Sequence, residues 1–177
     1  RIKEEVLTEM FPYLSREYGN PSSLYSIGRK SKRAIEEARK RVASLINCKP
    51  EEIYFTSCGS ESDNTALKGI AYANQNKGKH IITSKIEHPA ILHSCQNLEN
   101  KGFEVTYLDV DKDGFVNLET LEHSIRTDTI FISIMFANNE IGTIEPIEKI
   151  AKIAHKNGII FHTDAVQACG NIPIDVQ

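Results

Sequence analysis

The chain has 177 residues, of which 40% are hydrophobic and 25% are charged, and its formal net charge is −3. A chain of this length and composition can bury a core of its own and is typical of a soluble globular protein. The small negative charge gives no reason to expect nucleic acid or an anionic membrane as a partner, and no apolar run reaches the length of a membrane span.

The cysteines and histidines predict neither a disulfide framework nor a metal site. The four cysteines are far apart in the sequence and form no Cys-x-x-Cys pair, which is typical of a protein in a reducing compartment, so we expect a cytoplasmic location. The six histidines are scattered as well. His88 and His93 are five positions apart, so they do not share one helix face, and no His-Glu-x-x-His motif occurs.

The first part of the chain is predicted to be helical. Residues 2–18 have an apolar pattern that Pro12 interrupts, and the Gly-Asn-Pro-Ser-Ser sequence at 19–23 is a break. We therefore expect an N-terminal helix and loop segment at 1–23 and a larger domain at 24–177. A long amphipathic helix is predicted over 24–46, with its basic face solvated. The stripe that this pattern predicts to be buried consists of Ile27, Ala34, Ala38, Val42 and Leu45.

The stretch at 53–64 predicts a strand that turns tightly into a helix. An apolar run at 53–55 favours a strand, and Ser60 followed three residues later by Asp63 favours a capping box. A helix that starts after a glycine offers free backbone N–H groups to an anion, so Gly59 and Ser60 are candidates for a phosphate cradle. The alternative is an ordinary capped turn without a ligand, and no dinucleotide or P-loop motif decides between the two.

The remaining sequence alternates between strand-like and helix-like segments. Strands are predicted at 80–84, 103–110, 129–136 and 159–163, and helices at 89–101, 118–126 and 146–157. Strands that are separated by helices favour βαβ crossovers. We therefore predict an α/β fold with a mostly parallel sheet that is sandwiched by helices.

Polar groups follow three of the predicted strands where each one ends. These groups are Glu-His-Pro at 87–89, Asn-Asn-Glu-Ile-Gly at 138–142 and His-Thr-Asp-Ala-Val-Gln at 162–167. Each has an ordinary alternative as a loop, a turn or a helix start. Together with the Gly59 turn they predict a site at the carboxyl edge of the sheet, with an anion cradle, an imidazole, amides and a carboxylate. This set suits pyridoxal phosphate, whose ring nitrogen needs a carboxylate to stay protonated.

At this point the chain resembles a known family. Five motifs occur in the order and spacing of the cysteine desulfurases of the NifS/IscS type, which belong to the class V aminotransferase group of pyridoxal-phosphate enzymes. The motifs are Gly-Asn-Pro-Ser-Ser, Phe-Thr-Ser-Cys-Gly-Ser-Glu-Ser-Asp-Asn, Glu-His-Pro-Ala, Asn-Asn-Glu-Ile-Gly and His-Thr-Asp-Ala-Val-Gln. The resemblance implies the large domain of the fold type I transferases, with residues 24–177 forming part of the cofactor-binding domain.

The resemblance also implies roles for residues that bind the cofactor. Gly59 and Ser60 would bind the phosphate group of pyridoxal 5′-phosphate, and Asp164 would pair with the ring nitrogen. Asn139 and Gln167 would donate hydrogen bonds to the phenolic oxygen of the ring. Asn139 would also contact the carboxylate of the substrate.

One residue is expected to be catalytic. By the resemblance, His88 would stack on the pyridine ring and shuttle protons. The lysine that holds the cofactor, the cysteine that accepts sulfur and most of the small domain are expected beyond Gln177, so we expect this chain to be a fragment that is inactive alone. No metal is expected.

The intact protein is expected to convert L-cysteine into alanine and an enzyme persulfide. The resemblance implies a homodimer and a sulfur-acceptor protein, such as a scaffold for iron–sulfur cluster assembly. One alternative keeps the fold and changes the chemistry to another class V aminotransferase or a selenocysteine lyase. The other alternative is a non-catalytic binding or dimerisation fragment.

Overall fold

The computed structural model describes all residues from 1 to 177, and they form two compact units. The first unit contains Arg1–Phe55 and Pro173–Gln177, and the second contains Thr56–Ile172. None of the helices combines the length and the apolar character that crossing a bilayer requires.

The first unit is helical. It contains α1 (Glu4–Ser15), α2 (Ser26–Leu45) and the short 3₁₀ helix η1 (Pro50–Glu52). The basic face of α2 is exposed, as predicted. The predicted buried stripe is wrong, because Ile27, Val42 and Leu45 are exposed, whereas the buried positions of α2 are Gly28, Ser31 and Ala43.

The close approach of the preceding loop explains this difference. A Cβ atom at Gly28 would lie 2.0 Å from the Ser23 Oγ and 2.2 Å from the Asn20 carbonyl oxygen. The loop therefore covers Gly28 at the start of α2, whereas the neighbouring Ile27 stays exposed.

The strand predicted at 53–55 is absent, because these residues pair with no strand of the sheet. Tyr54 is 84% exposed and Phe55 is 51% exposed. Arg39 takes the place of a neighbouring strand: its guanidinium donates to the Ile53 carbonyl oxygen and lies 5.0 Å from the centre of the Phe55 ring. A side chain thus satisfies the backbone that a ladder would otherwise pair.

The second unit contains the predicted parallel sheet. Its strands are β1 (His80–Ser84), β2 (Glu104–Leu108), β3 (Thr129–Ser133) and β4 (Ile160–His162), in the spatial order β2-β1-β3-β4. All three pairings are parallel, which confirms the predicted fold class. The helices are α3 (Gly59–Asn74), α4 (Pro89–Glu99), α5 (Leu118–His123) and α6 (Ile147–Lys156).

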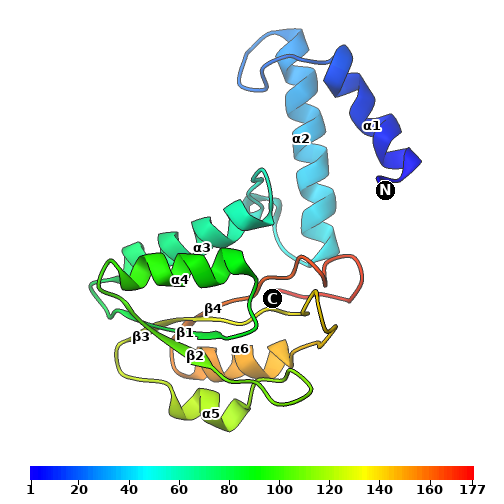
Figure 1. Cartoon of the computed structure of the whole chain (residues 1–177). Coiled ribbons are helices and arrows are strands. Elements are labelled where there is room, and N and C mark those ends of the chain that lie inside the picture. The colour runs from blue at the N-terminus through cyan, green and yellow to red at the C-terminus, as the bar shows by residue number, and fades with distance from the viewer. The chain divides into compact units, whose positions relative to one another are not determined.

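Two apolar clusters fix these helices on opposite faces of the sheet. Leu67 of α3 and Ile91 of α4 pack with Phe131 of β3 in one cluster. Leu121 of α5 and Ile150 of α6 belong to the other. Figure 1 shows α3 and α4 on one side of the strands and α5 and α6 on the other. Because every strand runs in the same direction, the chain leaves β1, β3 and β4 at one shared edge.

Candidate cofactor site

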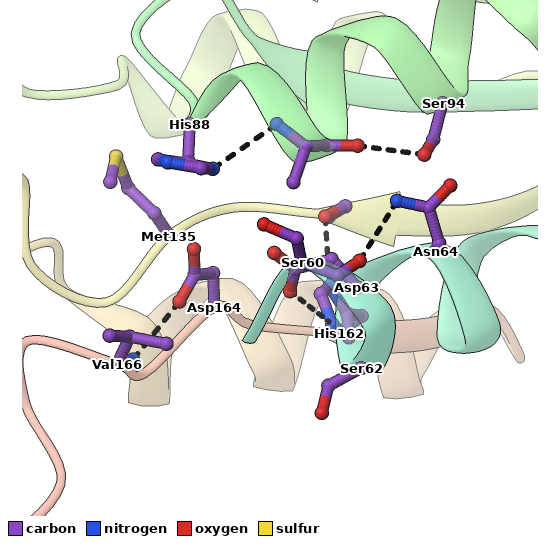
Figure 2. Close-up of polar contacts among 12 residues, drawn as sticks. Ser60, Ser62, Asp63, Asn64, His88, Ser94, Met135, His162, Asp164 and Val166 are labelled. Atoms are coloured by element: carbon purple, nitrogen blue, oxygen red, sulfur yellow. Dashed lines mark hydrogen bonds and ion pairs between the residues drawn. The ribbon is translucent and has the colours of Figure 1, made fainter. Parts of the chain in front are cut away.

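A cavity of about 240 Å³ lies at the carboxyl edge of the sheet, between the start of α3 and the segments that follow β1, β3 and β4. Its lining includes every site residue that the sequence predicted, so the fold brings four separate segments together. The lining residues are Cys58, Gly59, Ser60, Asp63, His88, Met135, Ala137, Asn139, Asp164, Val166 and Gln167. Figure 2 shows the polar contacts around this cavity.

The N-terminus of α3 forms one wall of the cavity. The helix begins at Gly59, so the first N–H groups lack carbonyl partners within the helix. A Cβ atom at Gly59 would lie 2.9 Å from the Val166 Cγ2, so a larger residue here would crowd the Val166 side chain. The N-terminus of a 16-residue helix and the Ser60 hydroxyl together suit an anion.

The capping box predicted for this helix is wrong, because no side chain caps α3 at Cys58. Glu61 takes over part of this task, since its Oε2 accepts hydrogen bonds from the Ser57 N–H at 2.6 Å and from the Ser57 hydroxyl at 2.7 Å. These bonds lower the pKa of the Glu61 carboxyl. Asp63 does not cap the helix; its side chain is 4% exposed and lines the cavity.

His88 is the N-cap residue of α4, and Pro89 starts the helix. The His88 Nδ1 accepts a hydrogen bond from the Ala90 N–H at 3.1 Å. An acceptor Nδ1 requires that the neutral ring carry its proton on Nε2. The backbone of α4 thus fixes the ring at the cavity wall and leaves Nε2 as the atom available to a ligand (Figure 2).

Asn139 lines the cavity, and the preceding residue holds it there. The Asn138 side chain donates to the Ile86 carbonyl oxygen at 3.0 Å. Its Oδ1 accepts from the Glu140 N–H at 2.8 Å and the Ile141 N–H at 3.0 Å. Asn138 therefore ties the loop after β3 to the segment just before His88. The sequence analysis placed Asn138 in a motif, but the pattern did not indicate that Asn138 holds the loop in place while Asn139 lines the cavity.

Asp164 and Gln167 come from the segment that follows β4. Asp164 is 8% exposed, and its Oδ1 accepts the Val166 N–H at 3.0 Å. Its carbonyl oxygen accepts the Phe136 N–H at 2.9 Å, which joins this segment to the one after β3. One carboxylate oxygen of Asp164 is therefore held by the backbone, and the side chain faces the cavity beside Gln167.

Three ionisable residues near the cavity were not predicted as site residues: Asp63 and Glu87, which are buried, and His162, which is half-buried. Burial, and then the charge of Asp164, raise the pKa of Asp63 to about 6, although His88 opposes the rise. Burial lowers the pKa of His162 to about 4, so the imidazole is neutral at pH 7. The helical spacing of Asp63 from Gly59 could have placed both on one face, but the sequence pattern favoured a capping role.

The six predicted site residues thus lie around one cavity, whereas their individual roles stay predictions. The arrangement offers an anion site at a helix start, an imidazole with a free Nε2, two amide side chains and a buried carboxylate. A ligand that uses all of these groups carries an anionic group, a flat ring and a basic nitrogen.

Comparison with known proteins agrees with this description. The family model described as "Aminotransferase class-V" matches residues 1–177. The chain is 61% identical over 176 residues to the cysteine desulfurase IscS of Methanosarcina thermophila, and 58% identical over 175 residues to that of Clostridium botulinum (strain Kyoto / Type A2). Each match covers 99% of this chain and 44% of the relative, so the chain spans less than half the length of these proteins.

Solved structures give the same result. A NifS-like protein superposes with a TM-score of 0.96 at 42% identity, over 99% of this chain and 49% of the other. A structure described as SspA in complex with cysteine has the same TM-score at 40% identity, over 99% of this chain and 50% of the other. The resemblance predicted from the five motifs is confirmed.

Proposed function

Because the chain belongs to the aminotransferase class V family, we propose that it is part of a pyridoxal-phosphate-dependent cysteine desulfurase. In the proposed reaction, L-cysteine loses its sulfur to an enzyme cysteine, which becomes a persulfide, and alanine is released. The observation that carries this proposal is the meeting of all six motif residues at one cavity, in a chain whose relatives are named cysteine desulfurases.

The residues around the cavity fit pyridoxal 5′-phosphate. The N-terminus of α3 suits a phosphate group, and Gly59 leaves space that a Cβ atom would fill against Val166. Asp164 supplies a buried carboxylate for a ring nitrogen, and Asn139 and Gln167 supply amide donors for the phenolic oxygen. When bound, this cofactor supplies a protonated pyridine ring that withdraws electrons from the bonds to the substrate's α-carbon.

The chain's own residues would then orient the cofactor ring and the substrate and would hold or transfer protons. Asp164 would stabilise a proton on the ring nitrogen, since a carboxylate favours the cationic form of a basic neighbour. The His88 Nε2 carries the proton that can be moved, because the Nδ1 is engaged by the Ala90 N–H. Asn139 can also donate to the carboxylate of L-cysteine, and Asn138 keeps it in position.

The partners and location of the protein are further parts of this proposal. The SspA structure is described as a complex with cysteine, which supports L-cysteine as the substrate class. We propose a homodimer that passes sulfur to an acceptor protein, such as a scaffold for iron–sulfur clusters. The four cysteines are free thiols, which is typical of a reducing compartment and supports a cytoplasmic location.

The test is a reaction of the full-length protein with L-cysteine and pyridoxal 5′-phosphate in the presence of a reductant. Equal amounts of alanine and sulfide are expected, and Asp164→Ala should reduce both by about 100-fold or more, because the charge that stabilises the protonated ring is lost. A protein that forms no sulfide and transfers the amino group to a 2-oxo acid would be an aminotransferase of the same family, and the proposal would be wrong.

A further inference from the structure

Helix α3 brings a second carboxylate, that of Asp63, to the cavity that Asp164 also lines. Asp63 and Asp164 both line the cavity, and they are 4% and 8% exposed. Figure 2 shows the two carboxyl groups on separate segments, with Asp63 on α3 and Asp164 after β4. Asp164 has a role in the proposed function, whereas Asp63 has none. A buried carboxyl group without a role in the fold calls for a partner.

The residue that contacts Asp63 does not neutralise its charge. The Asp63 Oδ1 lies 3.8 Å from the His162 Nε2, which is too long for a hydrogen bond. The His162 Nδ1 lies 2.9 Å from the Ser133 hydroxyl, which fixes the ring. Since the low pKa of His162 keeps the ring neutral, the imidazole can turn an N–H toward Asp63 but supplies no positive charge.

No lysine or arginine supplies that positive charge at the cavity. Among the ionisable groups, Asp164 and His88 act on Asp63 from the neighbouring segments, the first against its charge and the second in favour of it. On α3 itself, the carboxylate of Glu61 is turned to Ser57, and the Lys68 ammonium donates to the Asn64 side chain at 2.6 Å. The cavity lining contains neither lysine nor arginine. Two carboxylates thus face the cavity without a lysine or arginine beside them.

We propose that Asp63 is a positioning residue that acts together with Asp164 to make the cavity select a cationic ring nitrogen. The proposal rests on the proposed function, since the ring in question is that of the cofactor. Asp164 would contact the protonated nitrogen directly. Asp63 would add a second negative charge at the same cavity, so that the protonated ring is favoured over the neutral one. Burial, and then the charge of Asp164, raise the pKa of Asp63, so a cation bound at the cavity would stabilise the Asp63 carboxylate.

The experiment compares two ligands that differ only at the ring nitrogen. Pyridoxine 5′-phosphate lacks the aldehyde and forms no bond to a lysine, and its 1-deaza analogue has a C–H group in place of the nitrogen. Their dissociation constants are measured by calorimetry at pH 7.5 with the cofactor-free full-length protein, as wild type and as Asp63→Asn. The control Glu122→Gln removes one negative charge from an exposed position of α5.

Asp63→Asn should weaken the binding of pyridoxine 5′-phosphate about three- to tenfold, the range expected for a unit charge several ångströms away at a partly solvated site. The binding of the deaza analogue should stay unchanged, and Glu122→Gln should affect neither ligand. Circular dichroism checks the fold of each variant. If Asp63→Asn does not fold, Asp63→Ala removes the same charge with a residue that favours helix, and the same ratio is measured.

The outcomes separate this inference from the function on which it rests. Equal losses for both ligands would mean that Asp63 only supports the structure, and unchanged binding of both would mean that its charge does not reach the ring; either result overturns the inference and leaves the proposed function standing. A wild-type protein that binds neither ligand would overturn both.

Discussion

Glu87 is a buried acid whose replacement by glutamine should change how stability depends on pH. The residue is 4% exposed and lies between the ends of two strands. Its Oε1 accepts hydrogen bonds from the Ser84 hydroxyl at 2.6 Å and the Met135 N–H at 2.9 Å, whereas its Oε2 is buried without a partner. Burial raises the pKa of Glu87 to about 8; the two hydrogen bonds oppose the rise, and Asp164 and Glu145 add to it.

The size of the effect follows from the difference between the folded and unfolded states. The carboxyl group has its ordinary pKa of 4.5 in the unfolded chain and about 8 in the folded one. A raised folded-state pKa means that stability is fully present below pH 4.5 and is lost as the pH rises toward 8. From pH 5 to pH 8 the loss amounts to about 4 kcal/mol, at about 1.4 kcal/mol per pH unit. Glu87→Gln keeps the Oε1 acceptor and does not titrate, so it should not suffer this loss.

The assay is urea unfolding of the full-length protein at pH 5, 7 and 9, with Glu122→Gln as a control that changes an exposed acid. At pH 5 the variant should match the wild type to within about 1–3 kcal/mol, the cost of an amide N–H₂ without a partner. At pH 9 the stability of the variant relative to the wild type should be about 4 kcal/mol more favourable than at pH 5, because only the wild type loses stability as the pH rises. A difference between variant and wild type that stays constant with pH would refute a protonated Glu87 in the folded state.

Three further predictions concern residues around the site. Asn138→Ala should weaken pyridoxine 5′-phosphate binding about fivefold or more and lower the free energy of unfolding by about 2–3 kcal/mol. The reason is that it frees the Asn139 loop and removes the hydrogen-bond partner of three backbone groups; calorimetry and urea unfolding check this. Gly114→Ala should cost about 1–3 kcal/mol in the same unfolding assay, since Gly114 has φ +87° and a Cβ there would lie 2.4 Å from the Ile141 Cδ1. Burial lowers the pKa of His162 to about 4 in the folded protein, so the stability that the neutral ring contributes is present above pH 6.5 and is lost as the pH falls toward 4. His162→Asn does not titrate and should therefore lose about 3 kcal/mol less stability than the wild type between pH 7 and pH 4. Urea unfolding at the two pH values measures this difference.

The sheet could be predicted from the sequence because its central strands are buried on both faces. Ile81 and Ile132 are fully buried in different clusters, and such positions give short apolar runs between helical patterns. The run at 53–55 has the same character and still forms no strand. The Arg39 guanidinium binds the Ile53 carbonyl oxygen and the Phe55 ring. The local sequence pattern at 53–55 does not indicate this contact, because Arg39 comes from a helix 14 positions earlier.

The site was predictable to the extent that it follows from topology. Since parallel strands end at one edge, polar motifs after β1, β3 and β4 had to meet, and His88, Asn139 and Asp164 line one cavity. The residues that hold this site were not predictable in the same way. Asn138 acts through a hydrogen bond to the Ile86 carbonyl oxygen, 52 positions away in the sequence, and that bond exists only once the fold has formed.

The charges at the cavity restrict what can bind there more than its volume does. The N-terminus of α3 attracts an anion, but Asp63 and Asp164 repel one that comes without a compensating cation. Inorganic phosphate can interact favourably only with the N-terminus of α3, and the carboxylates of Asp63 and Asp164 repel it. A basic ring without a phosphate can use only the carboxylates. A ligand with a phosphate at one end and a protonated nitrogen in its ring can bind the helix N-terminus and the carboxylates together. The positive and the negative part of the site therefore favour the same ligand.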